Sequence, residues 1–225
     1  HVEALLRWDH PSLGRVPPPD FIPLAENAGY IRALTRWVIG AVIRQAGAWE
    51  RRGLDLHVSI NISAMDLVDE TLPDFVRATL AEHAVGPERI ALEVTESAVM
   101  QDATNALRVL QRLKEVGVRL SVDDFGTGQS SLAQLRRLPV DELKIDKSFI
   151  LDLQETPSDE SIEAIVRSAI ELGHNMGLSV VAEGVETAFS REWLARSRCD
   201  LAQGFLFSRP LAPEAFIDWL REYRP

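Results

Sequence analysis

The chain of 225 residues has little of several residue types that define whole classes of protein. It has one cysteine, Cys199, so an internal disulfide and a zinc site built from cysteines are both excluded. No apolar run approaches the roughly 20 residues of a membrane-spanning helix, and no secretory signal peptide opens the chain. The histidines lack the spacing of a histidine-based metal site. These absences fit a cytoplasmic domain, which segments upstream could still anchor in a membrane.

Positive charge is also scarce. Lys and Arg together number 24 against 34 Asp and Glu, which gives a net charge of −10. Because an acidic surface repels polyanions, we expect no DNA or RNA polymer as a partner and no membrane contact by this domain. A small anionic substrate stays compatible with this charge if bound cations supply positive charge locally. The 46% of hydrophobic residues is ordinary for a soluble globular protein.

Two hydrophobic periods alternate along the chain, and strands that alternate with helices are typical of a parallel α/β sheet. Alternation of apolar and polar residues predicts strands at Val2–Trp8, Leu56–Ile62, Ile90–Thr95, Val118–Val122, Leu143–Ile145, Leu178–Ala182 and Leu201–Phe207. Helical spacing predicts helices that start near Pro17–Pro19 and Ile31, then cover Asp74–Ala84, Leu107–Val116, Ser161–Met176, Glu186–Arg196 and Pro213–Tyr223. The tryptophans at helical spacing are expected in the core: Trp37, Trp49, Trp193 and Trp219.

Each predicted strand after the first carries a polar residue near its end, on the parity that does not face the helices. These residues are Asn61, Glu93, Asp123, Lys144, Glu183 and Gln203. In a closed (β/α) barrel that parity points inward, and the carboxyl ends of the strands meet at one mouth. An open doubly wound sheet would spread the same residues along an edge. We therefore predict a modified (β/α)₈ TIM-type barrel.

The strand count leaves a gap, because seven strands are found and a closed barrel needs eight. The chain begins inside a strand, so we expect the eighth strand upstream of His1. No stretch resembles a linker, and residues 1–225 are interpreted as one domain that is truncated at its N-terminus.

The converging side chains predict a cation site. They include the carboxylates of Glu3, Glu93, Asp123, Asp124 and Glu183, together with the amide of Asn61 and the ammonium of Lys144. Carboxylates crowded at one mouth repel each other unless they are protonated or share cations. Ligands that are all oxygen suit Mg²⁺ or Mn²⁺ rather than zinc or copper. Each motif alone also has a plain structural explanation: Glu93 could be a solvated edge residue, and Asp123–Gly128 could form only an Asx-type turn.

Taken together, the motifs resemble one family. Glu3-Ala4-Leu5-Leu6-Arg7-Trp8 opens the chain, and six further motifs follow in order: Asn61-Ile62-Ser63, Glu93-Val94-Thr95-Glu96, Asp123 to Ser131, Lys144-Ile145-Asp146, Glu183-Gly184-Val185-Glu186 and Gln203-Gly204-Phe205. This series is similar to the EAL-domain family of cyclic di-GMP phosphodiesterases, over nearly the whole chain. The family fold is a modified (β/α)₈ barrel whose first strand runs antiparallel, and that is the strand missing here.

The resemblance implies roles for individual residues. Glu3, Asn61, Glu93 and Asp123 would hold one metal ion, and Asp123 would bridge to a second ion held by Asp124 and supported by Glu183. Lys144 would lie beside the attacking water, Arg7 would contact a phosphate, and Gln203 would lie near the second ion and the substrate. Glu186 and Asp146 match family positions near the substrate. Glu96 would anchor the loop after Asp124, which contains Gly126, Thr127, Gly128 and Gln129.

The implied activity is hydrolysis of cyclic di-GMP to linear pGpG with two Mg²⁺ or Mn²⁺ ions, inhibited by Ca²⁺. The resemblance also implies a homodimer and an upstream sensory or diguanylate-cyclase-like domain. The chain departs from the family at Gln129, where tyrosine is usual, and this departure concerns the regulatory loop rather than the chemistry. Two alternatives stay open: a catalytically silent cyclic di-GMP receptor, and a barrel phosphohydrolase for another nucleotide.

Overall fold

The computed structural model describes residues 1–127, 132–155 and 159–223. Its centre is a curled sheet of seven strands in the order β1-β4-β5-β6-β7-β8-β9, in which every neighbouring pair is parallel. The strands are β1 (Val2–Ala4), β4 (Val58–Asn61), β5 (Ile90–Thr95), β6 (Arg119–Phe125), β7 (Glu142–Ile145), β8 (Ser179–Ala182) and β9 (Leu201–Ala202). The parallel α/β sheet is as predicted.

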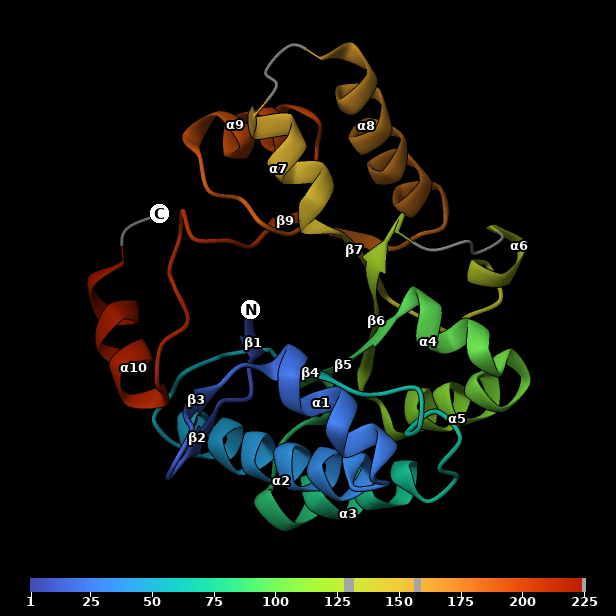
Figure 1. The fold of residues 1–225 in the computed structure, drawn as a ribbon, viewed down its shortest axis with the longest axis vertical. Helices are drawn as coiled ribbons and strands as arrows, with labels where there is room; N and C mark the ends of the chain where they lie inside the picture. The colour runs from blue at the N-terminus through green and yellow to red at the C-terminus, as the bar shows by residue number, and fades with distance from the viewer. Residues whose placement is uncertain (128–131, 156–158, 224–225) are drawn as a thin grey trace.

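Helices cover the outer side of this curled sheet (Figure 1). They are α1 (Pro18–Asn27), α2 (Ile31–Glu50), α3 (Leu72–His83), α4 (Glu96–Gln101), α5 (Ala103–Val116), α6 (Leu132–Leu135), α7 (Lys147–Glu155), α8 (Glu160–Asn175), α9 (Ala188–Arg196) and α10 (Pro213–Glu222), with a 3₁₀ turn at Pro87–Arg89. In Figure 1, α2, α3 and α5 lie at the bottom of the view, along one part of the curl, while α7, α8 and α9 lie at the top, along another part. None of the described helices is long and apolar enough to cross a membrane.

Buried Val, Ile and Leu side chains of the strands pack against these helices. Ile60, Leu92 and Leu120 are fully buried in the largest cluster, against Ile39 and Ile43 of α2. A second cluster joins Ile145 and Val180 to α8 and α9. Burial of this outward parity leaves the opposite parity, which includes Glu93 and Lys144, facing the inside of the curl. The alternation of apolar and polar residues therefore correctly predicts which strand residues face the helices.

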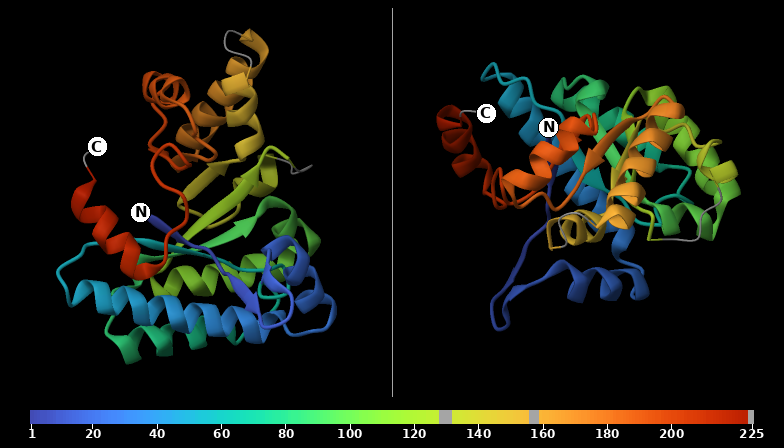
Figure 2. Two further views of the ribbon diagram at one scale, coloured as in Figure 1. Left: turned by 60° about the vertical axis from the view of Figure 1, so that its left-hand side comes forward. Right: turned by 90° about the horizontal axis from the view of Figure 1, so that it is seen from above.

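The N-terminal segment differs from the prediction of one strand over Val2–Trp8. Strand β1 ends at Ala4, and Trp8 begins a separate antiparallel hairpin of β2 (Trp8–His10) and β3 (Gly14–Val16). This hairpin lies beside α1 and outside the main sheet (Figure 2). The strand expected at Leu201–Phe207 is also shorter, because β9 ends at Ala202.

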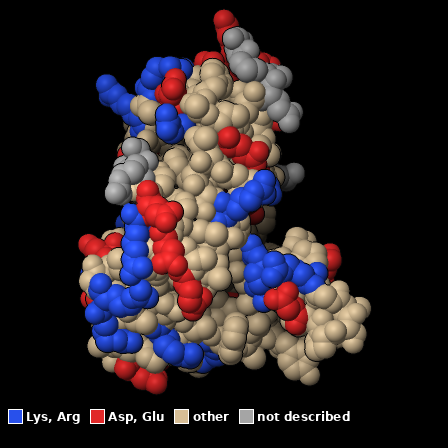
Figure 3. Space-filling model, turned by 90° about the vertical axis from the view of Figure 1, so that its left-hand side faces the viewer, with Lys and Arg blue, Asp and Glu red and all other residues tan. Residues whose placement is uncertain are grey.

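Two of the predicted core tryptophans are buried, and one prediction is wrong. Trp49 and Trp193 are buried, and Trp219 is half-buried beside Phe216. Trp37 is 64% exposed on α2, because its side of the helix faces solvent while Ile39 and Ile43 face the sheet. Lys/Arg and Asp/Glu side chains lie close together on the face shown in Figure 3.

Candidate active site

Lys144 lies at the centre of a cluster of carboxylates where the strands end. Its Nζ atom is 2.6 Å from Glu183, 2.9 Å from Glu93, 3.5 Å from Asp123 and 3.9 Å from Glu3. The Lys144 side chain is only 2% exposed. Strands β1, β5, β6 and β7 therefore bring their predicted polar residues together, and Glu183 joins them just after β8. This convergence is what the strand parity predicts.

The register of the parallel strands explains this convergence. Asn61 of β4 pairs with Glu93 of β5, and Lys144 of β7 pairs with Val181 of β8, two residues before Glu183. The backbone N–H of Glu183 donates to the carbonyl of Ile145, which continues the ladder just past the end of β8. Each polar residue is thus fixed by main-chain pairing of its own strand.

Glu3 links the two edges of the sheet. Its carboxylate accepts a hydrogen bond from the amide of Asn61 at 2.8 Å and another from the amide of Gln203 at 2.6 Å. Gln203 follows β9, and its backbone N–H donates to the carbonyl of Ala182. Since β1 and β9 are the two ends of the sheet order, this side-chain bridge connects strands that do not pair through their backbones.

The charges in the cluster do not balance. Four carboxylates surround one ammonium, so full ionisation would leave three uncompensated negative charges in a largely buried site. Burial raises the pKa of Glu93 and of Glu183 to about 7, although the nearby Lys144 favours their ionised forms. Burial alone would lower the pKa of Lys144, but the carboxylates of Glu93, Glu3, Asp123 and Glu183 raise it above its ordinary value. The cluster holds a charged lysine and more carboxylates than that lysine neutralises.

Asp123 and Asp124 lie inside strand β6, whereas the sequence placed Asp123 at the strand's end. The register between β6 and β7 shifts between Val122 and Phe125, which is the sign of a bulge. Asp124 adopts a left-handed conformation with φ of 55°, unusual for a residue other than glycine. The bulge accounts for two successive carboxylates near the site, since strict alternation would send them to opposite faces.

Asp124 and Asp146 form a second acidic pair beside the cluster. Burial, the charges of Asp123 and Asp146 and a hydrogen bond with Asp146 raise the pKa of Asp124. Burial acts in the same direction on Asp146, but hydrogen bonds from the hydroxyl and the backbone N–H of Ser148 lower its pKa overall. A proton shared by this pair would be held mainly on Asp124.

The loop after Asp124 is tied to helix α4 by Glu96, the first residue of that helix. This buried carboxylate accepts a hydrogen bond from the backbone N–H of Gly126 at 3.1 Å. Gly126 has φ of 99°, and a Cβ atom there would lie 2.8 Å from the ring of Phe149, so only glycine fits. Thr127 closes the turn, because its hydroxyl donates to the carbonyl of Asp124 at 2.9 Å.

Among the described residues, Arg7 and Glu186 form no hydrogen bond or ion pair with the cluster. Arg7 is exposed, and its guanidinium donates to the carbonyl of Leu6. Glu186 is exposed, and its backbone N–H donates to the side chain of Gln154. Gly128 and Gln129 lie outside the described residues, so the prediction about the loop departure stays a prediction.

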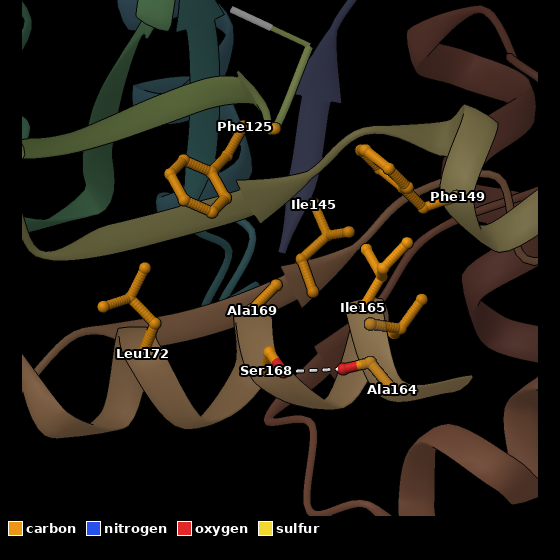
Figure 4. A pocket seen from close by; sticks show the side chains of 10 residues that line it. Phe125, Ile145, Phe149, Ala164, Ile165, Ser168, Ala169 and Leu172 are labelled. Carbon is orange, nitrogen blue, oxygen red and sulfur yellow. Dashed lines mark hydrogen bonds between the residues drawn. The ribbon is translucent and has the colours of Figure 1, made fainter. Parts of the chain in front are cut away.

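An apolar pocket has none of the cluster's carboxylates among the residues that line it. This cavity of about 480 Å³ is bounded by Phe125, Ile145 and Phe149 on one side and by α8 on the other (Figure 4). The hydroxyl of Ser168 within it donates to the carbonyl of Ala164 and so is already paired. An apolar lining offers a phosphate nothing to bind, so the carboxylate cluster is the better candidate for phosphate chemistry.

The donor set of the cluster fits a hard divalent cation. The cluster offers carboxylate oxygens and an amide oxygen, which are ligands that Mg²⁺ and Mn²⁺ prefer. Its excess negative charge also favours the binding of a cation. As the described side chains are placed, no three His, Cys, Asp or Glu residues form an arrangement ready to hold a metal ion. Lys144 occupies the centre instead, so a cation would have to share these carboxylates with the ammonium.

Comparison with known proteins agrees with this chemistry. The family model described as the EAL domain matches residues 1–210. The chain belongs to the EAL domain family. Its curled parallel sheet is accordingly a TIM-type barrel sheet, as predicted, and the family is one of cyclic di-GMP phosphodiesterases.

Two curated relatives and one solved structure illustrate the similarity. The bifunctional diguanylate cyclase/cyclic di-GMP phosphodiesterase MucR of Pseudomonas aeruginosa is 44% identical over 96% of this chain and 31% of its own length. The cyclic di-GMP phosphodiesterase PdeR of Escherichia coli is 40% identical over 99% of this chain and 33% of its own length. The solved structure of the PaMucR phosphodiesterase in complex with c-di-GMP superposes on this chain with a TM-score of 0.89. The two are 44% identical, and the match covers 95% of this chain and 86% of that one. The chain spans about a third of the length of these curated relatives.

Sequence reasoning missed the contacts that hold the loop after Asn61. Asp66, in that loop, is 1% exposed and accepts hydrogen bonds from Thr35 and Ser63. The available signal was the spacing Ser63-Ala64-Met65-Asp66, in which a side-chain acceptor lies three residues from a backbone donor. That spacing is common in turns, so it did not stand out.

Proposed function

We propose that this chain hydrolyses one phosphodiester bond of cyclic di-GMP to give linear pGpG, with two Mg²⁺ or Mn²⁺ ions, and so lowers the level of a bacterial second messenger. The observation that carries the proposal is the gathering of Glu3, Glu93, Asp123 and Glu183 around the buried ammonium of Lys144. Relatives named as cyclic di-GMP phosphodiesterases support the substrate class.

The resemblance to the family divides the proposed ligands between two ion positions. Glu3, Asn61, Glu93 and Asp123 would hold one ion, and Asp123, Asp124 and Glu183 the other. Divalent cations bound there would neutralise the phosphodiester, lower the pKa of water and stabilise the departing oxygen. Asp123 would belong to both groups: it precedes Asp124 in β6, and it shares the Lys144 ammonium with Glu93.

Lys144 would act on the attacking water. Its ammonium is buried among the carboxylates and remains charged, since their negative charge raises its pKa. A fixed positive charge beside water favours the deprotonated form and keeps the oxygen directed at phosphorus. This contribution is larger in the transition state than in the ground state, so Lys144 would mainly raise kcat.

Four residues around the cluster would contact the substrate. Arg7 is exposed and can present its guanidinium to a phosphate, which guanidinium groups bind in two-pronged fashion. Gln203 already donates to Glu3 and lies at the second edge of the sheet. Glu186 and Asp146 would complete the substrate contacts on the side of β7 and β8.

The direct test is product analysis. The chain is incubated with cyclic di-GMP and either Mg²⁺, Mn²⁺, Ca²⁺ or a chelator, and the nucleotides are separated by chromatography. We expect pGpG with Mg²⁺ or Mn²⁺ and none with Ca²⁺ or the chelator. Asp123→Asn should lose turnover by more than about tenfold while it stays folded, because one charge is removed from a repelling cluster. Product formation in excess chelator would contradict the metal requirement.

The same experiment separates the alternatives. Tight binding of cyclic di-GMP without turnover in Mg²⁺ or Mn²⁺ would identify a silent receptor. Turnover of another nucleotide in preference to cyclic di-GMP would identify a different phosphohydrolase.

We also propose that the chain acts as a homodimer within a longer protein that has an upstream sensory or cyclase-like domain. Its coverage of about a third of its curated relatives supports the larger protein. Light scattering coupled to size exclusion would measure the oligomeric state, and a strictly monomeric species at all concentrations would contradict the dimer.

A further inference from the structure

The loop between Asn61 and helix α3 is held by a compact set of hydrogen bonds centred on Asp66. The Asp66 Oδ2 atom accepts three hydrogen bonds, each of 2.8 Å, from the backbone N–H of Ser63, the hydroxyl of Ser63 and the hydroxyl of Thr35. In return, the backbone N–H of Asp66 donates to the carbonyl of Ser63 at 3.0 Å. Asp66 therefore fixes the turn that begins two residues after Asn61.

Helix α2 supplies the fixed end of this arrangement. Thr35 is 5% exposed, and one turn of the helix carries two more contacts to the same loop. Arg32 donates to the carbonyl of Met65 at 3.1 Å, and Arg36 donates to Asp69 at 2.9 Å. Because α2 is packed on the sheet through Ile39 and Ile43, it gives the loop a rigid support.

The backbone of Asn61 is fixed on one side by its pairing with Glu93 at the end of β4, and on the other side by the turn that follows. Ile62, the next residue, donates its backbone N–H to the carbonyl of Glu93, and Ser63 is then bound by Asp66. The Asn61 side chain is exposed and its Nδ2 donates to Glu3, so the place of its carbonyl oxygen depends on this hydrogen bond and on the backbone at the end of β4. Asp66 acts on that backbone through the direction in which the chain leaves β4.

We propose that Asp66 is a positioning residue for the cation site: it fixes the turn at Ser63 to Thr35 of α2 and thereby places the carbonyl oxygen of Asn61 for a divalent cation. The inference rests on the proposed function, because it takes Asn61 to be a metal ligand. Asp66 itself touches neither cation nor substrate. Groups one layer behind a metal ligand commonly change metal affinity by about 10–100-fold when they are removed.

The test is Mn²⁺ binding to the whole chain, measured by titration calorimetry, with melting temperature measured in parallel. Asp66→Ala should weaken Mn²⁺ binding about tenfold, and Asp66→Asn, which keeps an acceptor oxygen, should restore affinity to within about threefold of the parent. The matched control is Asp69→Ala, since Asp69 ties the same loop to the same helix but does not bind Ser63. It should lower the melting temperature without changing Mn²⁺ affinity.

Thr35→Val keeps the inference testable if Asp66→Ala does not fold. It removes the hydroxyl that donates to Asp66 at nearly constant volume and should weaken Mn²⁺ binding by about threefold or more. Equal Mn²⁺ affinity of the parent, Thr35→Val and any folded Asp66→Ala protein would overturn the inference and leave the proposed function standing. Equal weakening by Asp69→Ala and Asp66→Ala would show general loop loosening and would also overturn it. Absence of Mn²⁺ binding by the parent would overturn both.

Discussion

The unbalanced charge around Lys144 predicts how the stability of the metal-free protein depends on pH. Burial raises the pKa of Glu93 and Glu183 from an ordinary value of 4.5 to about 7 in the folded chain. Between these values the folded state holds more protons than the unfolded state, so the free energy of unfolding falls as pH rises. We expect the metal-free protein to be most stable near pH 5 and to lose stability through neutrality.

The size of the loss follows from the pKa difference. A rise from 4.5 to about 7 corresponds to about 3 kcal/mol for one group, at roughly 1.4 kcal/mol for each pKa unit. Both glutamates lie against the same ammonium, so their titrations are linked, and about 3 kcal/mol is taken for the pair rather than for each. For a chain of this length that is a fall in melting temperature of roughly 6–12 °C. Asp69, whose pKa is lowered to about 2, titrates below this window and does not disturb it.

The assay is thermal unfolding followed by circular dichroism from about pH 5 to 8, in chelator and in Mg²⁺. In chelator the melting temperature should fall with pH. Mg²⁺ should raise it more at pH 8 than at pH 5, because a cation binds ionised carboxylates. Glu93→Gln should flatten the dependence in chelator, since it removes one of the titrating groups. A melting temperature that is constant or rises from pH 5 to 8 in chelator would refute the reasoning, as would an unchanged slope in Glu93→Gln.

Three further predictions concern single residues. Lys144→Ala should lower kcat for cyclic di-GMP by several powers of ten while the Kd for substrate changes by less than about tenfold, and an effect on Kd alone would show that Lys144 only binds. Gly126→Ala should lower stability by about 1–3 kcal/mol, because its Cβ atom would meet Phe149 and its φ is positive; a melting temperature equal to the parent's would contradict this. Burial raises the pKa of the Cys199 thiol to about 11, so iodoacetamide at pH 8 should modify the folded chain much more slowly than the urea-unfolded chain, and equal rates measured by mass spectrometry would contradict it.

The features that could be predicted from the sequence are those set by strand parity. Alternation identified which side of each strand is apolar, and the polar residues on the other side could then be placed at one mouth. Asp123 and Lys144 meet in the structure for this reason, at 3.5 Å, although 21 residues separate them. Strand ends were less predictable, because β6 continues through a bulge to Phe125 and a bulge leaves no periodic signal.

Exposure on helices and short strands could not be predicted from local pattern alone. Trp37 has the spacing of a core residue, but whether that side of α2 meets the sheet depends on how the helix is rotated. Strand β1 and the hairpin strand β2 are separated by only Leu5–Arg7. So short a separation leaves no visible break between the two strands in the sequence. Contacts such as those of Asp66 depend on a helix and a loop that meet only in the folded chain.

Lys144 and the carboxylates around it compensate each other's charge only in part. A lysine that is 2% exposed is costly unless negative charge surrounds it, and carboxylates at a strand mouth are costly unless positive charge surrounds them. Each therefore makes the other tolerable, yet one ammonium cannot neutralise four carboxylates. Burial, together with the remaining negative charge, raises the pKa of Glu93 and Glu183 in the metal-free protein, and the same negative charge favours the binding of divalent cations. Stability at low pH without metal and the proposed activity with metal would then have the same physical origin, so a variant that loses one of these properties should also lose the other.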